Sequence, residues 1–221
     1  MFSSERENLT VQCPSCGQSV STEVVYIIEP ESPELELLMT GQINLATCEA
    51  CNTAFLMQTP LLYRDDEDRF IAYYMPVEDD EKQEEAVEEI NKITDIVFDN
   101  DIQPTCRLTF SHRGFIEKIM IQDHGLDDRL IEYMKYQLFN RPDQKIDPVR
   151  FEMLYDFSRP ETDIVAFVLF DRETGEPSAA AHLPLDTYDE LSATFLANES
   201  TREELEKLFP GPVVAVDRVL F

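Results

Sequence analysis

Two pairs of cysteines constrain this chain more than any other feature of its sequence. Cys13 and Cys16 form one C-x-x-C pair, Cys48 and Cys51 form a second, and 31 residues lie between the pairs. Two residues between ligands allow both thiolates of a pair to bind one ion from a tight turn, and two such turns complete a tetrahedron of sulfur ligands. The spacing therefore predicts one structural Zn²⁺ ion, held by these four cysteines.

The residues beside the cysteines suit such metal-binding turns. Pro14 fixes the backbone directly after the first thiolate. Gly17 follows the second thiolate, where a positive φ allows amide N–H groups to face sulfur. Asn52 occupies the matching place in the second pair, and Asn is the residue other than glycine that best tolerates this conformation. The 31 residues between the pairs exceed the 15–20 of the usual short zinc-binding pattern. A helix over residues 32–41, inserted between two hairpins, would explain the difference.

Disulfides, a dithiol redox site and an iron–sulfur cluster are the alternatives to zinc. Five cysteines, an odd number, in a chain that begins without a basic and apolar leader do not indicate a disulfide framework. A redox C-x-x-C usually acts as one pair at a helix N-terminus, whereas both pairs here are flanked by strand-like sequence. Ligation by four thiolates leaves no open coordination position, so we do not expect the metal to be catalytic.

Charge and composition narrow the class of protein further. Lys and Arg number 18 and Asp and Glu number 45, which gives a formal charge of −27. Such a chain repels nucleic acid and anionic lipid, because both require basic patches. The 43% hydrophobic content supplies a core, and the longest apolar run, residues 164–170, is far shorter than the roughly 20 residues that span a bilayer. We expect a soluble, cytoplasmic, globular protein without a membrane segment.

The pattern along the chain predicts an α+β fold with two domains. A zinc ribbon with short antiparallel strands occupies about residues 9–76, a helical segment follows over 78–139, and a turn near residues 140–145 precedes a C-terminal mixed α+β unit at 146–221. Strands are predicted at 20–28, 42–47, 54–57, 61–63, 70–75, 106–110, 151–157, 164–171, 178–183 and 213–221. Helices are predicted at 33–41, 78–98, 113–123, 126–139, 185–196 and 201–208, the last opened by a capping box at residues 200–203.

The acidic run that opens the helical segment has two interpretations. Eight of the twelve residues from Glu78 to Glu89 are acidic, which is also typical of a solvated linker. However, Val87, Ile90, Ile93 or Thr94, and Val97 recur at three- and four-residue steps. This periodicity favours an amphipathic helix whose acidic first half suits the helix dipole.

A series of short motifs resembles the CpXC domain family over about residues 9–139. The motifs are Cys13-Pro14-Ser15-Cys16-Gly17, Gly41-Gln42-Ile43-Asn44 before the second cysteine pair, residues 60–65 (PLLYRD), residues 106–108 (CRL), residues 117–119 (EKI) and residues 125–132 (GLDDRLIE). Asn52 departs from the glycine that many members have. The resemblance implies a zinc-ribbon-like prokaryotic module and no reaction, and residues 146–221 lie outside it.

No other residue carries an equally specific chemical pattern. Cys106 stands alone in an apolar strand, which is typical of a small core residue, and its pairing with Ser111 and His112 lacks an identifiable third group. His124 suits the end of a helix, and Asp127 and Asp128 suit the start of the next one. We therefore expect a non-enzymatic module that binds a protein partner, with an enzyme as the alternative and a nucleic-acid-associated zinc ribbon third.

Overall fold

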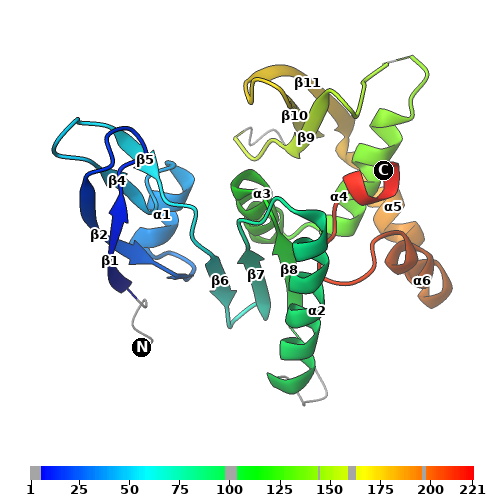
Figure 1. Ribbon diagram of the computed structural model, residues 1–221. Coiled ribbons are helices and arrows are strands. Elements are labelled where there is room, and N and C mark those ends of the chain that lie inside the picture. The colour runs from blue at the N-terminus through cyan, green and yellow to red at the C-terminus, as the bar shows by residue number, and fades with distance from the viewer. Residues whose placement is uncertain (1–5, 98–103, 144, 159–162, 196–197) are drawn as a thin grey trace. The chain divides into compact units, whose positions relative to one another are not determined.

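The protein divides into two compact units, residues 1–116 and residues 117–221. The structure, a computed structural model, describes residues 6–97, 104–143, 145–158, 163–195 and 198–221, and the side chains of residues 94–97 also lie outside this description (Figure 1). Helices are combined with antiparallel and mixed sheets, so the predicted α+β class is confirmed.

Small sheets form most of the first unit. Strands β1 and β2 form one antiparallel hairpin, and β4 and β5 form another. A mixed sheet has the order β3-β6-β7-β8, in which the central pair is antiparallel and both outer pairs are parallel. The strands are β1 Arg6–Gln12, β2 Ser19–Val25, β3 Ile27–Ile28, β4 Leu45–Thr47, β5 Ala54–Leu56, β6 Leu61–Asp65, β7 Phe70–Tyr74 and β8 Thr105–Thr109. The short antiparallel strands of the predicted ribbon are thus present, and β1 is a further strand that was not predicted from the sequence.

Helix α1, Pro33–Met39, lies between the two hairpins in the chain, as the sequence predicts. The Ser32 side chain caps it by accepting a hydrogen bond from the backbone N–H of Leu35, with proline in the first turn. Gly41, at φ +68°, follows the helix, in the left-handed conformation that commonly ends helices. Leu38 is fully buried, so this short helix is held by its apolar side chain as well as by its cap.

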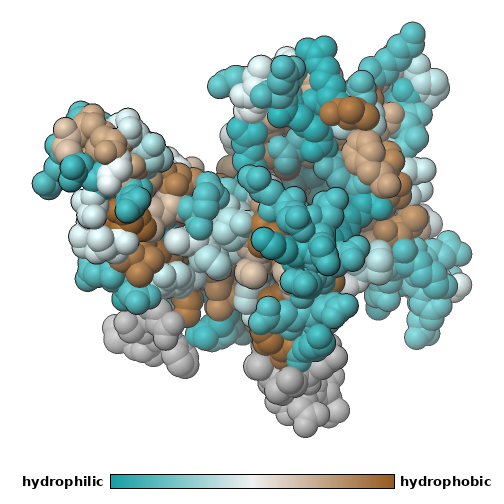
Figure 2. Space-filling view, in the orientation of Figure 1, coloured by the Kyte–Doolittle hydropathy of each residue, from teal (hydrophilic) through white to brown (hydrophobic). Residues whose placement is uncertain are grey.

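Most of the acidic run lies in helix α2, Asp80–Val97, so the interpretation as a helix is correct and the interpretation as a linker is not. Ala86 and Ile90 are buried and Val87 is half-buried, whereas Ile93 is 38% exposed. The carboxylates of the predicted acidic run are all exposed, and Figure 2 shows hydrophilic residues over the visible side of the helix. The buried side is therefore narrow, and most of the helix surface is acidic.

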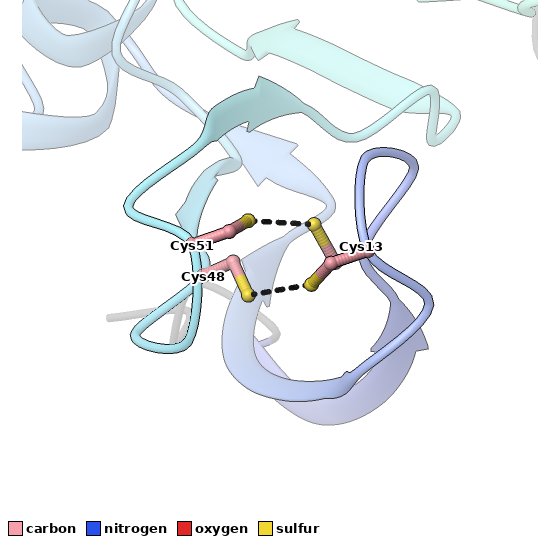
Figure 3. Close-up of side chains that lie close together, drawn as sticks. Cys13, Cys48 and Cys51 are labelled. Carbon is pink, nitrogen blue, oxygen red and sulfur yellow. Dashed lines mark hydrogen bonds between the residues drawn. The ribbon is translucent and has the colours of Figure 1, made fainter.

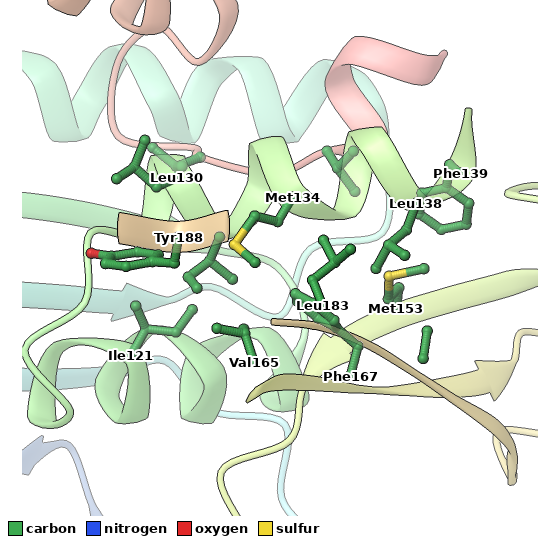
Figure 4. Packing of buried hydrophobic residues seen from close by; sticks show 14 of the residues in the cluster. Ile121, Leu130, Met134, Leu138, Phe139, Met153, Val165, Phe167, Leu183 and Tyr188 are labelled. Carbon is green, nitrogen blue, oxygen red and sulfur yellow. The ribbon is translucent and has the colours of Figure 1, made fainter. Parts of the chain in front are cut away.

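The second unit packs helices against a three-stranded antiparallel sheet of order β11-β10-β9. Its core is built from apolar side chains of α3, α4, the sheet and the C-terminal segment, and Figure 4 shows part of this cluster around Met134, Val165 and Phe167. The elements are α3 His112–Asp123, whose first residues belong to the first unit, α4 Asp128–Phe139, β9 Phe151–Tyr155, β10 Ile164–Asp171, β11 Pro177–Pro184, α5 Leu185–Phe195, α6 Glu199–Leu208 and α7 Asp217–Leu220.

Two predictions for the C-terminal unit are wrong. The apolar run 213–221 is not a strand: residues 213–215 have no regular structure, and α7 occupies Asp217–Leu220. Val214 and Val216 are buried in the core without a strand partner, so burial alone explains their apolar character. Helix α6 begins at Glu199, two residues before the predicted start, and its N-cap is Asn198, whose side chain accepts a hydrogen bond from the Ser200 N–H.

The compact units divide at residue 116, whereas the sequence placed a domain boundary near residues 140–145. These residues connect α4 to β9 inside the second unit. Buried side chains of α4, among them Met134 and Leu138, belong to the same core as Phe167 of β10. The boundary predicted near residues 140–145 remains a prediction that this turn is accessible to a protease.

Candidate metal centre

The first C-x-x-C pair lies in the turn of the β1–β2 hairpin. Strand pairing ends at Gln12 and Ser19, so the six residues between them form the loop. The backbone N–H of Cys13 donates to the Gln18 carbonyl at 2.8 Å, and that of Gly17 donates to the Cys13 carbonyl at 2.9 Å. Gly17 has φ +73°, as predicted from its place after the second cysteine. These bonds fold the loop back on itself and bring the two thiols to one side.

The second pair repeats this geometry in the turn between β4 and β5. The backbone N–H of Cys48 donates to the Thr53 carbonyl at 2.9 Å, and that of Asn52 donates to the Cys48 carbonyl at 2.7 Å. Asn52 has φ +58°, so the departure from glycine is accommodated without a change of conformation. The two loops, which we call the knuckles (residues 13–18 and 48–53), share the same hydrogen-bond pattern at corresponding positions.

The four sulfur atoms converge between the knuckles (Figure 3). All of them lie within 4.8 Å of one another, and the pairs Cys13–Cys51 and Cys16–Cys48 are each 3.6 Å apart. These distances are far longer than the roughly 2.05 Å of a disulfide, and all four cysteines are free. A tetrahedron with Zn–S bonds of about 2.3 Å has sulfur–sulfur edges of about 3.8 Å. The donor set therefore fits a zinc ion, and the four predicted ligands are brought together.

Each knuckle buries its first cysteine and exposes its second. Cys13 and Cys48 are 3% and 1% exposed, and they pack in a small apolar cluster with Val20 and Ala46, flanked by Val11, Phe55 and Met57. Cys16 and Cys51 are exposed. The cluster is small, so a metal ion bound by the four thiols would add to what holds the two knuckles together.

The second knuckle favours the thiolate form of Cys51. Its sulfur lies 3.2 Å from the Thr53 hydroxyl. Hydrogen bonds from the Thr53 hydroxyl and backbone N–H lower the pKa of the Cys51 thiol to about 6. A hydrogen bond with the Gln18 backbone lowers the pKa of the Cys16 thiol, but its hydrogen bond with Cys51 and burial raise this pKa to about 12, so the cluster must release protons when it binds a metal.

Asn44 ties the first hairpin to the segment that leads into the second. Its side-chain nitrogen donates to the Val25 carbonyl and to the Thr59 hydroxyl, each at 2.9 Å, and the Val25 N–H donates to its side-chain oxygen at 2.8 Å. Asn44 is buried and has φ +53°. The Asn44 side-chain amide thus hydrogen-bonds both backbone groups of Val25, as a neighbouring strand would do.

Comparison with protein families agrees with the motifs quoted above. The family model described as CpXC protein matches residues 11–135, which is more than half of the 221 residues. The chain belongs to the CpXC family. The CpXC match begins in β1, includes both knuckles and ends within α4. Neither a curated protein nor a solved structure matches the chain.

The other residues considered from the sequence have contacts of the kind found in ordinary packing and helix capping. His112 begins α3, its ring meets that of Tyr74 edge-on with centroids 5.7 Å apart, and burial lowers the pKa of its imidazole. Cys106 is half-buried in β8. His124 follows α3, and its Nδ1 lies 2.8 Å from the Tyr155 hydroxyl. The Asp127 side chain caps α4 by accepting from the N–H groups of Arg129 and Leu130, as expected for an acidic helix start.

Sequence reasoning missed a buried ionic cluster in the second unit, formed by α3 and α4. Lys118 contacts Asp128 at 3.2 Å and Glu132 at 2.9 Å, while Lys135 contacts Glu132 at 2.8 Å and Glu117 at 2.7 Å. All five side chains are less than 10% exposed. The signal in the sequence is a Glu-Lys pair at 117–118 placed inside an otherwise apolar helical stretch, where unpaired charges would be costly.

The cluster also binds two backbone segments of the second unit. The Val216 N–H donates to Glu132 Oε2 at 2.8 Å, and the Tyr155 N–H donates to Glu117 Oε1 at 2.5 Å. Burial raises the pKa of Glu117. Burial alone would also raise the pKa of Glu132, but Lys118 and Lys135 lower it below its ordinary value. Three carboxylates and two ammonium groups are thus held together at the centre of the unit.

In the described part of the chain, no helix is both long and apolar enough to cross a membrane. The longest helix, α2, is the strongly acidic one.

Proposed function

We propose that the protein is a non-enzymatic protein-interaction module whose N-terminal ribbon is held by one structural Zn²⁺ ion. The observation that supports this most is the convergence of four free thiols from two matching knuckles. Four thiolates complete the coordination of zinc and leave no position for a substrate. The metal then supplies folding energy, of about 10–16 kcal/mol apparent binding energy, rather than chemistry.

A protein partner agrees better with the charge of the chain than a nucleic acid does. At a formal charge of −27 the surface repels phosphates, whereas the exposed tips of the knuckles, Ser15, Glu49 and Ala50, are uncharged or acidic. Loops fixed by a metal site are rigid, so binding to them costs little conformational entropy. We also propose residence in a reducing compartment such as the cytoplasm, where free thiol ligands persist.

Metal analysis tests the zinc site. Freshly reduced protein should contain about one equivalent of zinc, and the double variant Cys13→Ser with Cys48→Ser should contain none. Cys106→Ser, which removes a thiol outside the cluster, should retain the full zinc content. Iron in place of zinc, or no metal in reduced wild-type protein, would contradict the proposed metal.

Partner capture from the native lysate tests the module. We expect one partner protein in stoichiometric amount. Its binding should fall when Ala50→Arg alters the exposed knuckle tip, while the zinc content stays unchanged. A partner that is captured equally well by Ala50→Arg would place the binding surface outside the knuckle tip. The absence of any partner, together with catalytic turnover by the purified protein, would favour the alternative of an enzyme.

A further inference from the structure

Strand β11, Pro177–Pro184, forms one edge of the three-stranded sheet in the second unit (Figure 1). Among the described strands it pairs with β10 alone, over all but the bulged part of its length. An edge strand presents unpaired N–H and C=O groups and is a template for a further strand unless it is protected. The availability of β11 for such pairing depends on which of its backbone groups point outward.

A hydrogen bond on the other side of β10 fixes the directions of the backbone groups in β11. The Asp156 N–H donates to the Ala166 carbonyl at 2.9 Å, so the backbone groups of Ala166 face β9. Backbone direction alternates along a strand, and Phe167 therefore faces β11, where it lies opposite Ala181. By the same alternation, Ala180 and His182 turn their N–H and C=O groups away from β10. Four strong hydrogen-bonding groups thus line the open edge.

The usual protections of an edge strand are weak here. Proteins commonly place charged side chains, Pro or bulges on exposed edges. The residues of β11 between its terminal prolines, Ser178 to Leu183, are mostly small and carry no Lys, Arg, Asp or Glu. The bulge opposite Leu169 and Phe170 and the prolines at the ends limit further pairing to about residues 179–183. Ala180 and His182, at the centre of this stretch, are exposed.

The charges at the two ends of β11 indicate what kind of strand can pair with its open edge. Exposed Glu173 and Glu176 precede the strand, and exposed Asp186 and Asp189 follow it. Two copies of β11 paired antiparallel would bring the acidic start of one strand against the acidic end of the other, and like charges in such positions are destabilising. A segment with basic residues at both ends has the complementary charge.

We propose that β11 binds an extended segment of a partner protein as an additional strand, and that Lys or Arg residues flank the pairing part of this segment. Backbone hydrogen bonds to Ala180 and His182 supply the pairing, and the acidic ends of the strand select the flanks. The site lies outside the CpXC match and uses no part of the metal centre, so it goes beyond the function proposed above and does not depend on it.

Two nine-residue peptides test this proposal with the full-length, zinc-loaded protein. One carries the core Thr-Val-Thr-Val-Thr between pairs of Lys, and the other carries the same core between pairs of Glu. We expect saturable binding of the Lys peptide, weakened by salt, and slower hydrogen exchange at the Ala180 and His182 amides in the complex. The Glu peptide should bind at least about tenfold more weakly, since each end then adds repulsion.

A pair of variants at one position separates edge pairing from other binding modes. Ala180→Pro removes an outward N–H and should lower the affinity for the Lys peptide about tenfold or more, while the sheet survives because proline is tolerated where the N–H faces solvent. Ala180→Thr keeps the N–H and should bind like the wild type. Circular dichroism of both variants confirms that the fold is retained.

Four results would overturn the proposal. They are equal binding of the two peptides, no saturation by the Lys peptide in the millimolar range, slow exchange of the Ala180 and His182 amides in the free protein, and a homodimer in sedimentation that Ala180→Pro dissociates. The last result would assign the edge to a second copy of the chain. Removal of the zinc ligands distinguishes this site from the module proposed for the ribbon, because peptide binding to β11 should persist.

Discussion

At the scale of single residues, Asn44 combines a strained backbone with a buried amide that no other side chain reproduces. It donates two hydrogen bonds and accepts one, and the Val25 backbone depends on it for both of its polar groups. Asn44→Asp keeps the shape but replaces the donor nitrogen by a charged acceptor. We expect a loss of about 1–3 kcal/mol in the free energy of unfolding of the zinc-loaded protein, because the Val25 carbonyl is left without a donor.

Denaturant unfolding, followed by far-ultraviolet circular dichroism, measures this difference. Gln42→Glu is the matched control, since Gln42 is exposed two residues before Asn44 and the substitution adds the same charge. It should change the free energy of unfolding by less than about 0.5 kcal/mol. Equal effects at the two positions would mean that added charge, and not the lost donor, is responsible.

Lys135 is the residue whose replacement should affect the second unit most. It is fully buried, lies between Glu117 and Glu132, and these carboxylates hold its pKa well above the ordinary value. Lys135→Met removes a positive charge that both carboxylates contact. It should lower the free energy of unfolding by about 3–5 kcal/mol. Lys207→Met on exposed α6 removes the same charge from the surface and should have little effect.

The pH dependence of the Lys135→Met variant has a definite sign. Without the ammonium group, burial raises the pKa of Glu117 and Glu132 above their unfolded values, so the folded state binds protons more strongly. The free energy of unfolding of the variant should therefore rise as the pH falls from 7 towards 5. In the wild type the raised pKa of Glu117 and the lowered pKa of Glu132 change the stability in opposite directions on acidification, so the wild type should gain less stability than the variant. A variant that loses stability on acidification would contradict this explanation.

At the scale of elements, α2 is a helix that carries more negative charge than its own stability favours. Asp80, Glu84 and Glu88 are exposed and follow one another at four-residue steps, and such like-charge pairs each cost a few tenths of a kcal/mol. Glu84→Lys converts two repulsive pairs into attractive ones. Thermal unfolding should show a stabilisation of about 0.5–1 kcal/mol, with Glu84→Gln giving roughly half of it. No gain from either substitution would indicate that α2 contributes little to the unfolding transition.

Elements with a local origin were predictable from the sequence, and those that depend on distant partners were not. Helix α1 follows from the Ser32 cap and Gly41, and the four clustered cysteines follow from the spacing within each knuckle. The ionic cluster escaped prediction because Glu117 and Glu132 meet only after two helices pack. Residues 213–216 have the composition of a strand, but a strand exists only where a neighbour pairs with it, and sequence patterns do not reveal that neighbour.

At the scale of the whole molecule, the family match and the compact units divide the chain differently. The CpXC match extends to residue 135, whereas the second unit begins at residue 117. Helix α4 is thus part of the family segment, yet its buried side chains complete a core with β9, β10 and α5. The CpXC segment by itself would leave this apolar side of α4 exposed.

Limited trypsin digestion tests which division governs folding. Lys145 is exposed beyond α4 and is the expected first cleavage site in the turn predicted as a boundary. The two fragments should remain together in size-exclusion chromatography, because α4 and β9 belong to one core, and should separate only in denaturant. Fragments that separate without denaturant would show that the boundary near residues 140–145 is the functional one. Resistance at Lys145 with cleavage at Lys82 would show that the accessible segment lies at α2.

The matching geometry of the two knuckles has a consequence for how the site is assembled during translation. Cys48 is the 32nd residue after Cys16, so at 5–20 residues per second the ribosome needs roughly 2–6 s to add it. Throughout this interval the nascent chain carries only half of the sulfur ligands, and the first hairpin has no counterpart on which to close. Capture of the proposed metal by four thiols would therefore be a late event for the ribbon, and the thiols of the first knuckle are exposed to oxidants until the second one is synthesised.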